Sequence, residues 1–274
     1  MATTDDNDIQ DKEMPLLEHL IELRNRLTWA VGALLVGFLA CYAFADQIYG
    51  FLVAPLAEIL SERGGDRRMI YTALTEVFFT YVKVAFFAGA FLAFPVMATQ
   101  LWLFIAPGLY KKEKMALLPF IVATPILFVI GASMVYYVIF PLAWRFFLSF
   151  ETPSIEGGLP IQLEAKVGEY LNLVMKLIFA FGIAFQLPVA LTLMAKVGIV
   201  SSDGLRKKRK YAIVAVFGCA AILTPPDVIS QIGLAIPIML LYEISIHLAR
   251  LVEKKRAERE AEEEAADTAG DGAE

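Results

Sequence analysis

Charged residues are scarce in this chain. They make up 19% of its 274 residues, whereas hydrophobic residues make up 58%. A soluble domain usually carries about 25% charged and about 45–50% apolar residues. The few charges lie in the two tails and in short clusters between long apolar blocks. This distribution excludes an ordinary soluble domain and favours a chain that is solvated mostly by lipid.

Cysteine and histidine are also rare, with two of each. Cys41 and Cys219 lie inside apolar blocks without metal-ligand or redox spacing, so we interpret them as small buried side chains. His19 and His247 lie near opposite ends of the sequence. We find no Ser/His/Asp set, no Gly-rich phosphate loop and no metal-ligand spacing. The sequence therefore predicts neither an enzyme nor a cofactor, and it gives no sign of nucleic-acid binding.

Six apolar blocks are candidate membrane spans, since crossing the hydrocarbon core takes about 20 apolar residues. They run from about Thr28 to Ala45, Val77 to Phe104, Met115 to Pro141, Tyr170 to Ala195, Tyr211 to Leu223 and Val228 to Leu248. We predict that the last two are short and form a tight hairpin, because only Thr224–Asp227 separates them. The fifth block would rise only about 20 Å.

The distribution of basic residues predicts the orientation. Of the 24 Lys and Arg residues, 17 fall in the N-terminal stretch, the loops after the second and fourth blocks, and the C-terminal end. Five fall in the other loops, and Lys83 and Lys176 lie inside blocks. Since cytoplasmic segments carry an excess of Lys and Arg, this predicts six spans with both ends in the cytoplasm. Pro225 and Pro226 argue against merging the last two blocks into one helix.

The rest of the chain divides simply. Residues 1–14 form an acidic tail, the reverse of the basic start of a signal peptide, and residues 15–250 form the membrane domain. Residues 251–274 are a charged tail that we expect to be disordered or loosely helical. The long outer loops, about Asp46–Glu76 and Leu142–Glu169, are predicted to be ordered caps.

An amphipathic segment, Pro15–Leu27, precedes the first block. Leucines at helical spacing occupy one face, and Glu18, Glu22 and Asn25 occupy the other. We expect it to lie along the membrane interface or to pack on the protein. It is either an ordinary entry helix with a Glu22–Arg26 pair or a segment in which Glu22 has a function.

Further polar residues interrupt the apolar pattern. Glu113 is the sole acid among three lysines in the loop after the second block, and is either a solvated ion pair or a carboxylate presented to a cationic peptide. Gln186 lies too deep in its block to reach the surface, which predicts an interhelical hydrogen bond. Prolines in or at the ends of blocks predict kinked helices around a concave surface. These are Pro95, Pro125, Pro141, Pro188 and Pro237.

Several segments closely resemble those of one family, TatC, the receptor subunit of the bacterial twin-arginine protein translocase. They are HLIELRNRL (His19–Leu27), AP-L (Ala54–Leu56), FIAPGLYKKEK (Phe104–Lys114), FPLA (Phe140–Ala143), AFGIAFQLPVA (Ala180–Ala190), LRKKRKY (Leu205–Tyr211) and LTPPDVISQ (Leu223–Gln231). The resemblance covers about Pro15 to Arg250.

The resemblance implies an all-α polytopic membrane protein of the bacterial cytoplasmic (inner) membrane. It implies six transmembrane helices in a cupped arrangement, with both termini cytoplasmic. Such a protein binds the twin-arginine signal peptides of folded precursors at the cytoplasmic face. It recruits the single-span subunits TatA and TatB into a multimeric complex, and export is driven by the proton-motive force.

The resemblance also implies roles for individual residues. The signal-peptide site would comprise Glu22, Arg24, Phe104 and Glu113. The partner-binding and structural positions would be Pro55, Gln186, Thr224, Asp227 and Gln231. We expect the two glutamates of the site to form one acidic patch, since arginine offers a planar fork to carboxylate oxygens, and we expect Arg24 to orient Glu22.

One departure and two alternatives remain. Many family members carry a glutamate where this chain has Gln186, so a role that needs a titrating acid there is in doubt, whereas a hydrogen-bonding role survives. A secondary transporter for a small solute would favour an internal repeat and a mid-membrane site, and we find neither. A membrane-embedded enzyme would need a catalytic set within the spans, and none is recognisable.

Overall fold

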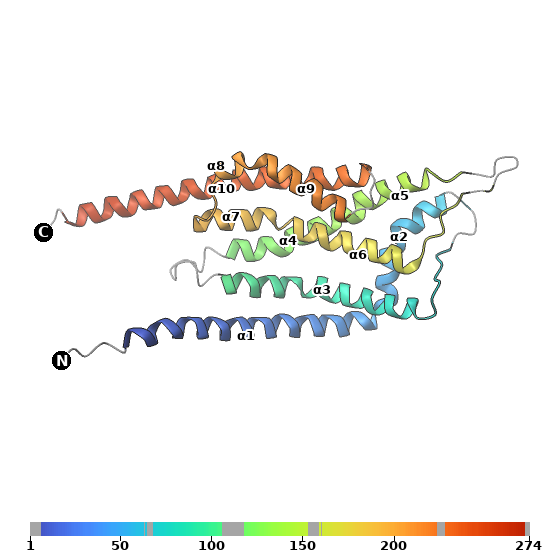
Figure 1. Cartoon of the computed structure of the whole chain (residues 1–274), viewed down its shortest axis with the longest axis horizontal. Helices are drawn as coiled ribbons and strands as arrows, with labels where there is room; N and C mark the ends of the chain where they lie inside the picture. The colour runs from blue at the N-terminus through green and yellow to red at the C-terminus, as the bar shows by residue number, and fades with distance from the viewer. Residues whose placement is uncertain are drawn as a thin grey trace. The chain divides into compact units, whose positions relative to one another are not determined.

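The computed structural model describes residues 7–62, 64, 68–105, 118–152, 159, 161–223 and 228–271. In these residues the chain is almost entirely helical (Figure 1). The helices are α1 (Asn7–Ala43), α2 (Ala45–Glu62), α3 (Glu76–Ile105), α4 (Leu118–Met134), the π-helix η3 (Val135–Ile139), α5 (Phe140–Leu148), α6 (Val167–Ala184), α7 (Leu187–Val197), α8 (Ser202–Lys207), α9 (Arg209–Leu223) and α10 (Val228–Asp271).

Five helical stretches of the described residues are long and apolar enough to cross a membrane. They are Leu17–Ala43, Glu76–Phe104, Leu118–Leu148, Val167–Val197 and Gln231–Glu258. The all-helical membrane class predicted from the sequence is thus confirmed. The fifth predicted span, α9, has 15 residues and rises only about 22 Å.

Two predicted boundaries are wrong. The segment Pro15–Leu27 is not a separate interface helix, because α1 continues through it into the first span. The last predicted span is not short, because α10 is 44 residues long, and its tail is helical to Asp271 rather than disordered. The tail is rich in Ala, Glu, Lys and Arg, all strong helix formers, so nothing in it ends the helix. The short span is therefore α9.

The chain forms two compact units, which we describe separately. Unit 1 comprises residues 1–48 and 81–125, and unit 2 comprises residues 49–80 and 126–274.

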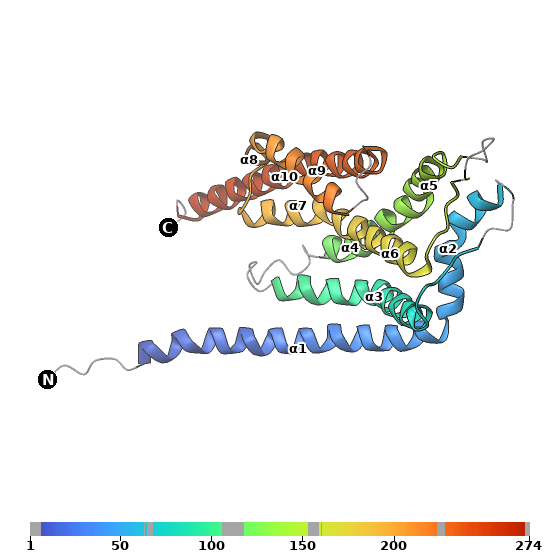
Figure 2. The same cartoon turned by 45° about the vertical axis from the view of Figure 1, so that its right-hand side comes forward.

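In unit 1, α1 and α3 lie side by side and approach closely at two glycines (Figure 2). A Cβ atom on Gly37 would lie 2.7 Å from the carbonyl oxygen of Gly89, and one on Gly89 would lie 2.5 Å from the backbone nitrogen of Phe38. Small residues allow such backbone contact between helices in lipid. Farther along α3, the indole N–H of Trp102 donates to Thr124 Oγ1 of α4 at 2.8 Å.

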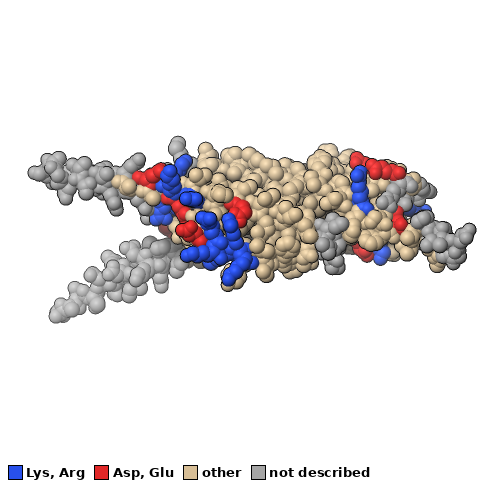
Figure 3. Space-filling view, turned by 90° about the horizontal axis from the view of Figure 1, so that it is seen from above, with Lys and Arg blue, Asp and Glu red and all other residues tan. Residues whose placement is uncertain are grey.

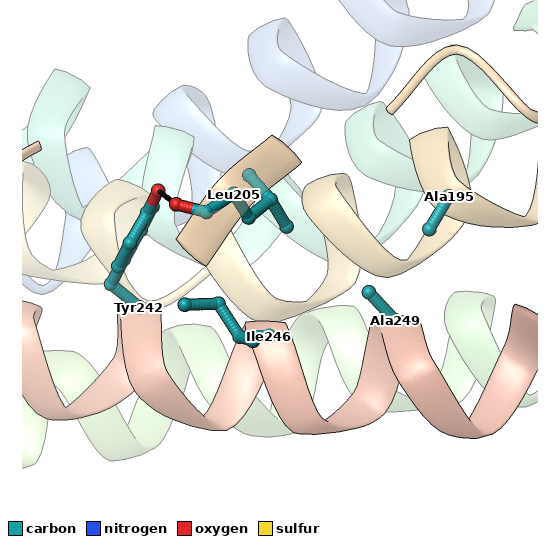
Figure 4. Packing of buried hydrophobic residues seen from close by; sticks show 5 residues of the cluster. All are labelled: Ala195, Leu205, Tyr242, Ile246 and Ala249. Atoms are coloured by element: carbon teal, nitrogen blue, oxygen red, sulfur yellow. Dashed lines mark hydrogen bonds between the residues drawn. The ribbon is translucent and has the colours of Figure 1, made fainter. Parts of the chain in front are cut away.

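In unit 2, a buried cluster joins α7, α8 and α10 (Figure 4). Its members are Ala195, Leu205, Tyr242, Ile246 and Ala249. The Tyr242 hydroxyl donates to the Leu205 carbonyl at 2.8 Å, which fixes α8 to α10 within this cluster.

A carboxylate fastens the same region. Ser202, at the start of α8, donates its backbone N–H to Glu253 Oε1 at 2.7 Å and its hydroxyl to Glu253 Oε2 at 2.5 Å. The part of α10 beyond the membrane-spanning residues is thereby anchored. The prediction of buried cysteines is wrong for Cys219, which is exposed on α9, and Cys41 is partly exposed.

The two long loops of unit 2 are hydrogen-bonded to each other where they are described. Ile70 and Lys166 form a parallel bridge. Glu76 accepts hydrogen bonds from the backbone N–H groups of Thr72 at 2.9 Å and Gly168 at 3.1 Å. One carboxylate thus links the start of α3 to the first turn of α6, and these residues are ordered as predicted.

The close contact in unit 1 leads to a first prediction. Gly37→Ala should lower the thermal unfolding midpoint in detergent, because its Cβ would meet the Gly89 carbonyl. Gly32→Ala, on the same helix, is the matched control, since its Cβ would meet nothing within 4 Å. The control should be neutral or stabilising by up to about 1 kcal/mol, because alanine favours helix more than glycine does. Equal midpoints for the two variants would contradict the close contact.

Candidate functional site

Unit 1 contains a groove of about 690 Å³ between α1 and α3. It is lined by Glu18, Ile21, Glu22, Asn25, Arg26 and Trp29 of α1 and by Gln100 and Leu103 of α3. The α1 residues are spaced three or four apart, so they share one helix face. The lining combines carboxylates with apolar side chains. The groove therefore offers both charge and apolar surface to a ligand.

Glu22, one of the predicted site residues, is held by Arg26. The Nε and Nη2 atoms of Arg26 donate to Glu22 Oε1 at 2.9 and 2.5 Å. Arg26 Nη1 also donates to Gln100 Oε1 of α3 at 3.5 Å. The Glu22–Arg26 pair predicted from the spacing is confirmed.

Arg24 does not orient Glu22, as the sequence led us to expect. It is exposed, and its guanidinium donates to Asn25 Oδ1 at 3.4 Å. The reason is the helical period: Arg26 is one turn from Glu22 and shares its face, whereas a residue two positions away points elsewhere.

Phe104 lies beside α1 through an aromatic contact. Its ring stacks on that of His19, with 4.4 Å between centroids and 20° between planes. Phe104 follows Leu103 of the groove lining, and His19 follows Glu18, so the stacked pair adjoins the groove. Sequence reasoning missed His19. Its one available signal was its place beside Glu18 and three residues before Glu22.

Three predicted site residues lie outside the described residues. They are Glu113, Thr224 and Asp227. The acidic patch of Glu22 and Glu113 therefore stays a prediction. Within the groove, Glu18 is a second carboxylate, one turn from Glu22.

Pro55 lies inside α2 of unit 2, and two tyrosines compensate for it. Proline has no N–H, so the carbonyl four residues earlier, that of Phe51, loses its helical donor. The Tyr136 hydroxyl donates to this carbonyl at 2.6 Å, and the rings of Tyr136 and Phe51 stack at 4.4 Å. The Tyr170 hydroxyl donates to the next carbonyl, of Leu52, at 3.1 Å. Pro55 thereby fixes α2 to η3 and α6.

Gln186 lies at the break between α6 and α7. Its backbone N–H donates to Ile183 at 2.9 Å, a tighter turn than in an α-helix, which leaves the Gly182 carbonyl without that donor. The side-chain amide of Gln186 donates to the Gly182 carbonyl at 3.2 Å. The predicted hydrogen-bonding role is correct in kind, but this bond lies within the kinked span rather than between helices. An ionised glutamate could not donate it.

Gln231 and Lys176 both contact the short helix α9. Gln231 Nε2 donates to the Phe217 carbonyl at 3.3 Å, and Lys176 Nζ donates to the Ile222 carbonyl at 2.8 Å. The last carbonyls of a helix lack intrahelical donors and carry partial negative charge, so an ammonium stabilises them. Side chains of α10 and α6 therefore hold α9 near its C-terminal end.

The fold and the groove define a polytopic α-helical membrane protein with a polar groove along its first span. The described residues include no group of three His, Cys, Asp or Glu side chains that could hold a metal ion.

Comparison with known proteins identifies the family. The family model described as Sec-independent protein translocase protein (TatC) matches residues 18–237. The Sec-independent protein translocase protein TatC of Magnetococcus marinus is 59% identical over 255 residues, covering 93% of this chain and 91% of the relative. That of Escherichia coli K12 is 42% identical over 246 residues, covering 90% and 92%.

The fold agrees with this match. The crystal structure of the twin arginine translocase receptor TatC superposes with a TM-score of 0.73 and 37% identity, covering 85% of this chain and 99% of that one. The chain belongs to the TatC family.

The tyrosines around Pro55 lead to a second prediction. Tyr136→Phe should lower the free energy of unfolding by about 1 kcal/mol, because the Phe51 carbonyl loses its donor. In a Pro55→Ala background the same substitution should cost little, since the alanine N–H supplies the helical bond. The measurement is a double-mutant cycle of unfolding in detergent. Tyr137→Phe, at the exposed neighbouring position, is the control. Additive effects in the cycle would show that the hydroxyl does not serve Pro55.

Proposed function

We propose that this chain is the receptor of its twin-arginine translocase and that it binds the twin-arginine signal peptide of a folded precursor in the groove of unit 1. Its place in the TatC family makes it a core translocase component rather than an enzyme. The observation that carries the proposal is the groove itself, which combines Glu18 and Glu22 with apolar side chains on one helix face. A secondary transporter finds no support in these relatives.

The lining suits such a peptide chemically. Carboxylates bind guanidinium groups with charge-assisted hydrogen bonds, which are stronger than neutral ones. Ile21, Trp29 and Leu103 provide apolar surface for the hydrophobic region that follows the basic start of a signal peptide. The stacked rings of His19 and Phe104 add a face on which a cation can rest.

The site includes two residues beyond this groove. Glu113 supplies a further carboxylate from the loop after α3, where it is the sole acid among three lysines. Arg24 is exposed on α1 and contributes through the backbone, since its carbonyl accepts the Thr28 hydroxyl at 2.8 Å. Both assignments rest on the family's motifs.

The protein lies in the bacterial inner membrane with six spans and both termini in the cytoplasm. The 17 cations on one set of segments, against five on the other, support this topology. In the view of Figure 3, which faces α8–α10, Lys and Arg gather at one end of this surface, beside a band without charged side chains. Exposed cations there include Arg206, Lys207, Lys208 and Lys210.

The single-span subunits TatA and TatB dock along the hairpin of α9 and α10. Gln231, Thr224 and Asp227 are the proposed contacts, while Pro55 and Gln186 keep neighbouring helices in place. The shortness of α9 favours this edge, because partner helices relieve the mismatch between a span of about 22 Å and a core of about 30 Å. The active complex is multimeric.

A third prediction concerns Glu22. Glu22→Gln should weaken binding of a twin-arginine signal peptide about tenfold, because the carboxylate loses charge-assisted bonds worth about 1.4 kcal/mol. Binding is measured by fluorescence anisotropy on the full-length protein in nanodiscs. Glu58→Gln, an exposed acid of α2, makes the same charge change and should leave the affinity unchanged. A twin-lysine peptide that binds the wild type equally well would refute the proposed function.

A fourth prediction concerns Glu113. Charge reversal, Glu113→Lys, should abolish signal-peptide binding, because it removes a carboxylate and adds a fourth lysine to the loop. The companion assay is export of a folded reporter with a twin-arginine leader in cells that lack the native protein. Wild-type export should return when the gene is supplied, and the variant should not support it. Intact peptide binding by the variant would remove Glu113 from the site.

A further inference from the structure

The groove already holds a guanidinium group, that of Arg26. Two of its nitrogens donate to one oxygen of Glu22, and the third reaches the amide oxygen of Gln100. The two partners are themselves groove-lining residues. Arg26 is therefore bound as an arginine of a ligand would be bound.

We propose that Arg26 is a resident competitor of the signal peptide: it occupies Glu22 in the empty receptor, and a peptide arginine must displace it to bind there. This inference rests on the function proposed above. It assigns to Arg26 the setting of both affinity and selectivity.

The charges of the groove support this assignment. Arg26 neutralises Glu22, and Glu18 makes no ion pair within the described part of the chain. A peptide with one cation can therefore reach Glu18 without disturbing anything. A second cation gains a carboxylate only by taking Glu22 from Arg26. The empty groove thus presents one available carboxylate and one that is already paired.

This competition favours arginine over lysine. Replacing one guanidinium by another at Glu22 exchanges like for like. A lysine ammonium is a strongly hydrated point charge, so it gives up more hydration and makes a poorer contact than the planar fork it would displace. A competitor therefore rejects the wrong ligand, which is how many sites obtain specificity.

Exchange is physically accessible. The side chains of Arg26 and Glu22 are 24% and 29% exposed, so water can take over either partner when the pair opens. The second oxygen of Glu22 accepts no hydrogen bond within the described residues, which gives an incoming arginine a first contact before Arg26 leaves.

A purely structural role for Arg26 predicts the opposite result. If Arg26 only oriented Glu22, removing it would weaken peptide binding. If Arg26 competes, removing it strengthens binding. The sign of one measurement therefore separates the two roles.

The experiment compares Arg26→Gln with the wild type, full-length and in nanodiscs, using twin-arginine and twin-lysine peptides. We expect the variant to bind the twin-arginine peptide roughly three- to tenfold more tightly, the range for losing a partly exposed ion pair. The ratio of twin-arginine to twin-lysine affinity should fall. Arg26→Lys should show a smaller gain, because an ammonium cannot make both contacts. Arg206→Gln, which removes an exposed cation of α8, should change neither affinity.

Two further outcomes keep the inference separate from the proposed function. Arg26→Gln combined with Glu22→Gln should bind as Glu22→Gln alone does, since the competitor acts only at Glu22. If the wild type prefers twin arginine and needs Glu22, but both Arg26 variants bind it equally or more weakly, the competition is refuted and the receptor role stands. A wild type without that preference refutes the receptor role itself.

Discussion

Inside a bilayer every backbone carbonyl must find its donor within the protein, because lipid supplies none. Interruptions of the helices in unit 2 are compensated by side chains. Tyr136 serves the carbonyl that Pro55 leaves free, the amide of Gln186 serves the break before α7, and Lys176 serves the end of α9. These polar side chains lie where a helix is irregular. They keep kinked and shortened helices at defined positions, which a run of apolar side chains could not do.

Unit 1 treats its polar groups differently. Glu22, Arg26 and Gln100 satisfy one another through side chains and remain partly exposed in the groove. Side-chain pairs can open and re-form with a ligand, whereas the backbone carbonyls of a span need their donors at all times. This difference explains why recognition is proposed for the groove, and why Pro55, Gln186 and Gln231 are better understood as residues that hold helices for other contacts.

The hairpin of α9 and α10 combines two opposite extremes. α9 has 15 residues, whereas α10 has 44 and extends well beyond any membrane core. Glu253, far along α10, caps the first residue of α8, so the long helix also organises the loop that leads into the short one. The rigid part of this edge is therefore α10, and α9 is positioned by contacts from its neighbours.

The sequence alone determined the class of the protein, because long apolar blocks have few other stable solutions than helices in lipid. It also determined the Glu22–Arg26 pair and the break near Pro188, since both follow from local spacing and from the missing N–H of proline. It misjudged α1 and α10, because helix ends depend on caps and packing that periodicity does not contain. Only the tertiary structure showed that Tyr136 serves Pro55, that His19 stacks on Phe104, and that Gln100 completes the setting of Arg26. Each of these contacts joins residues more than 70 positions apart, and their distance in space is decided by how the helices pack.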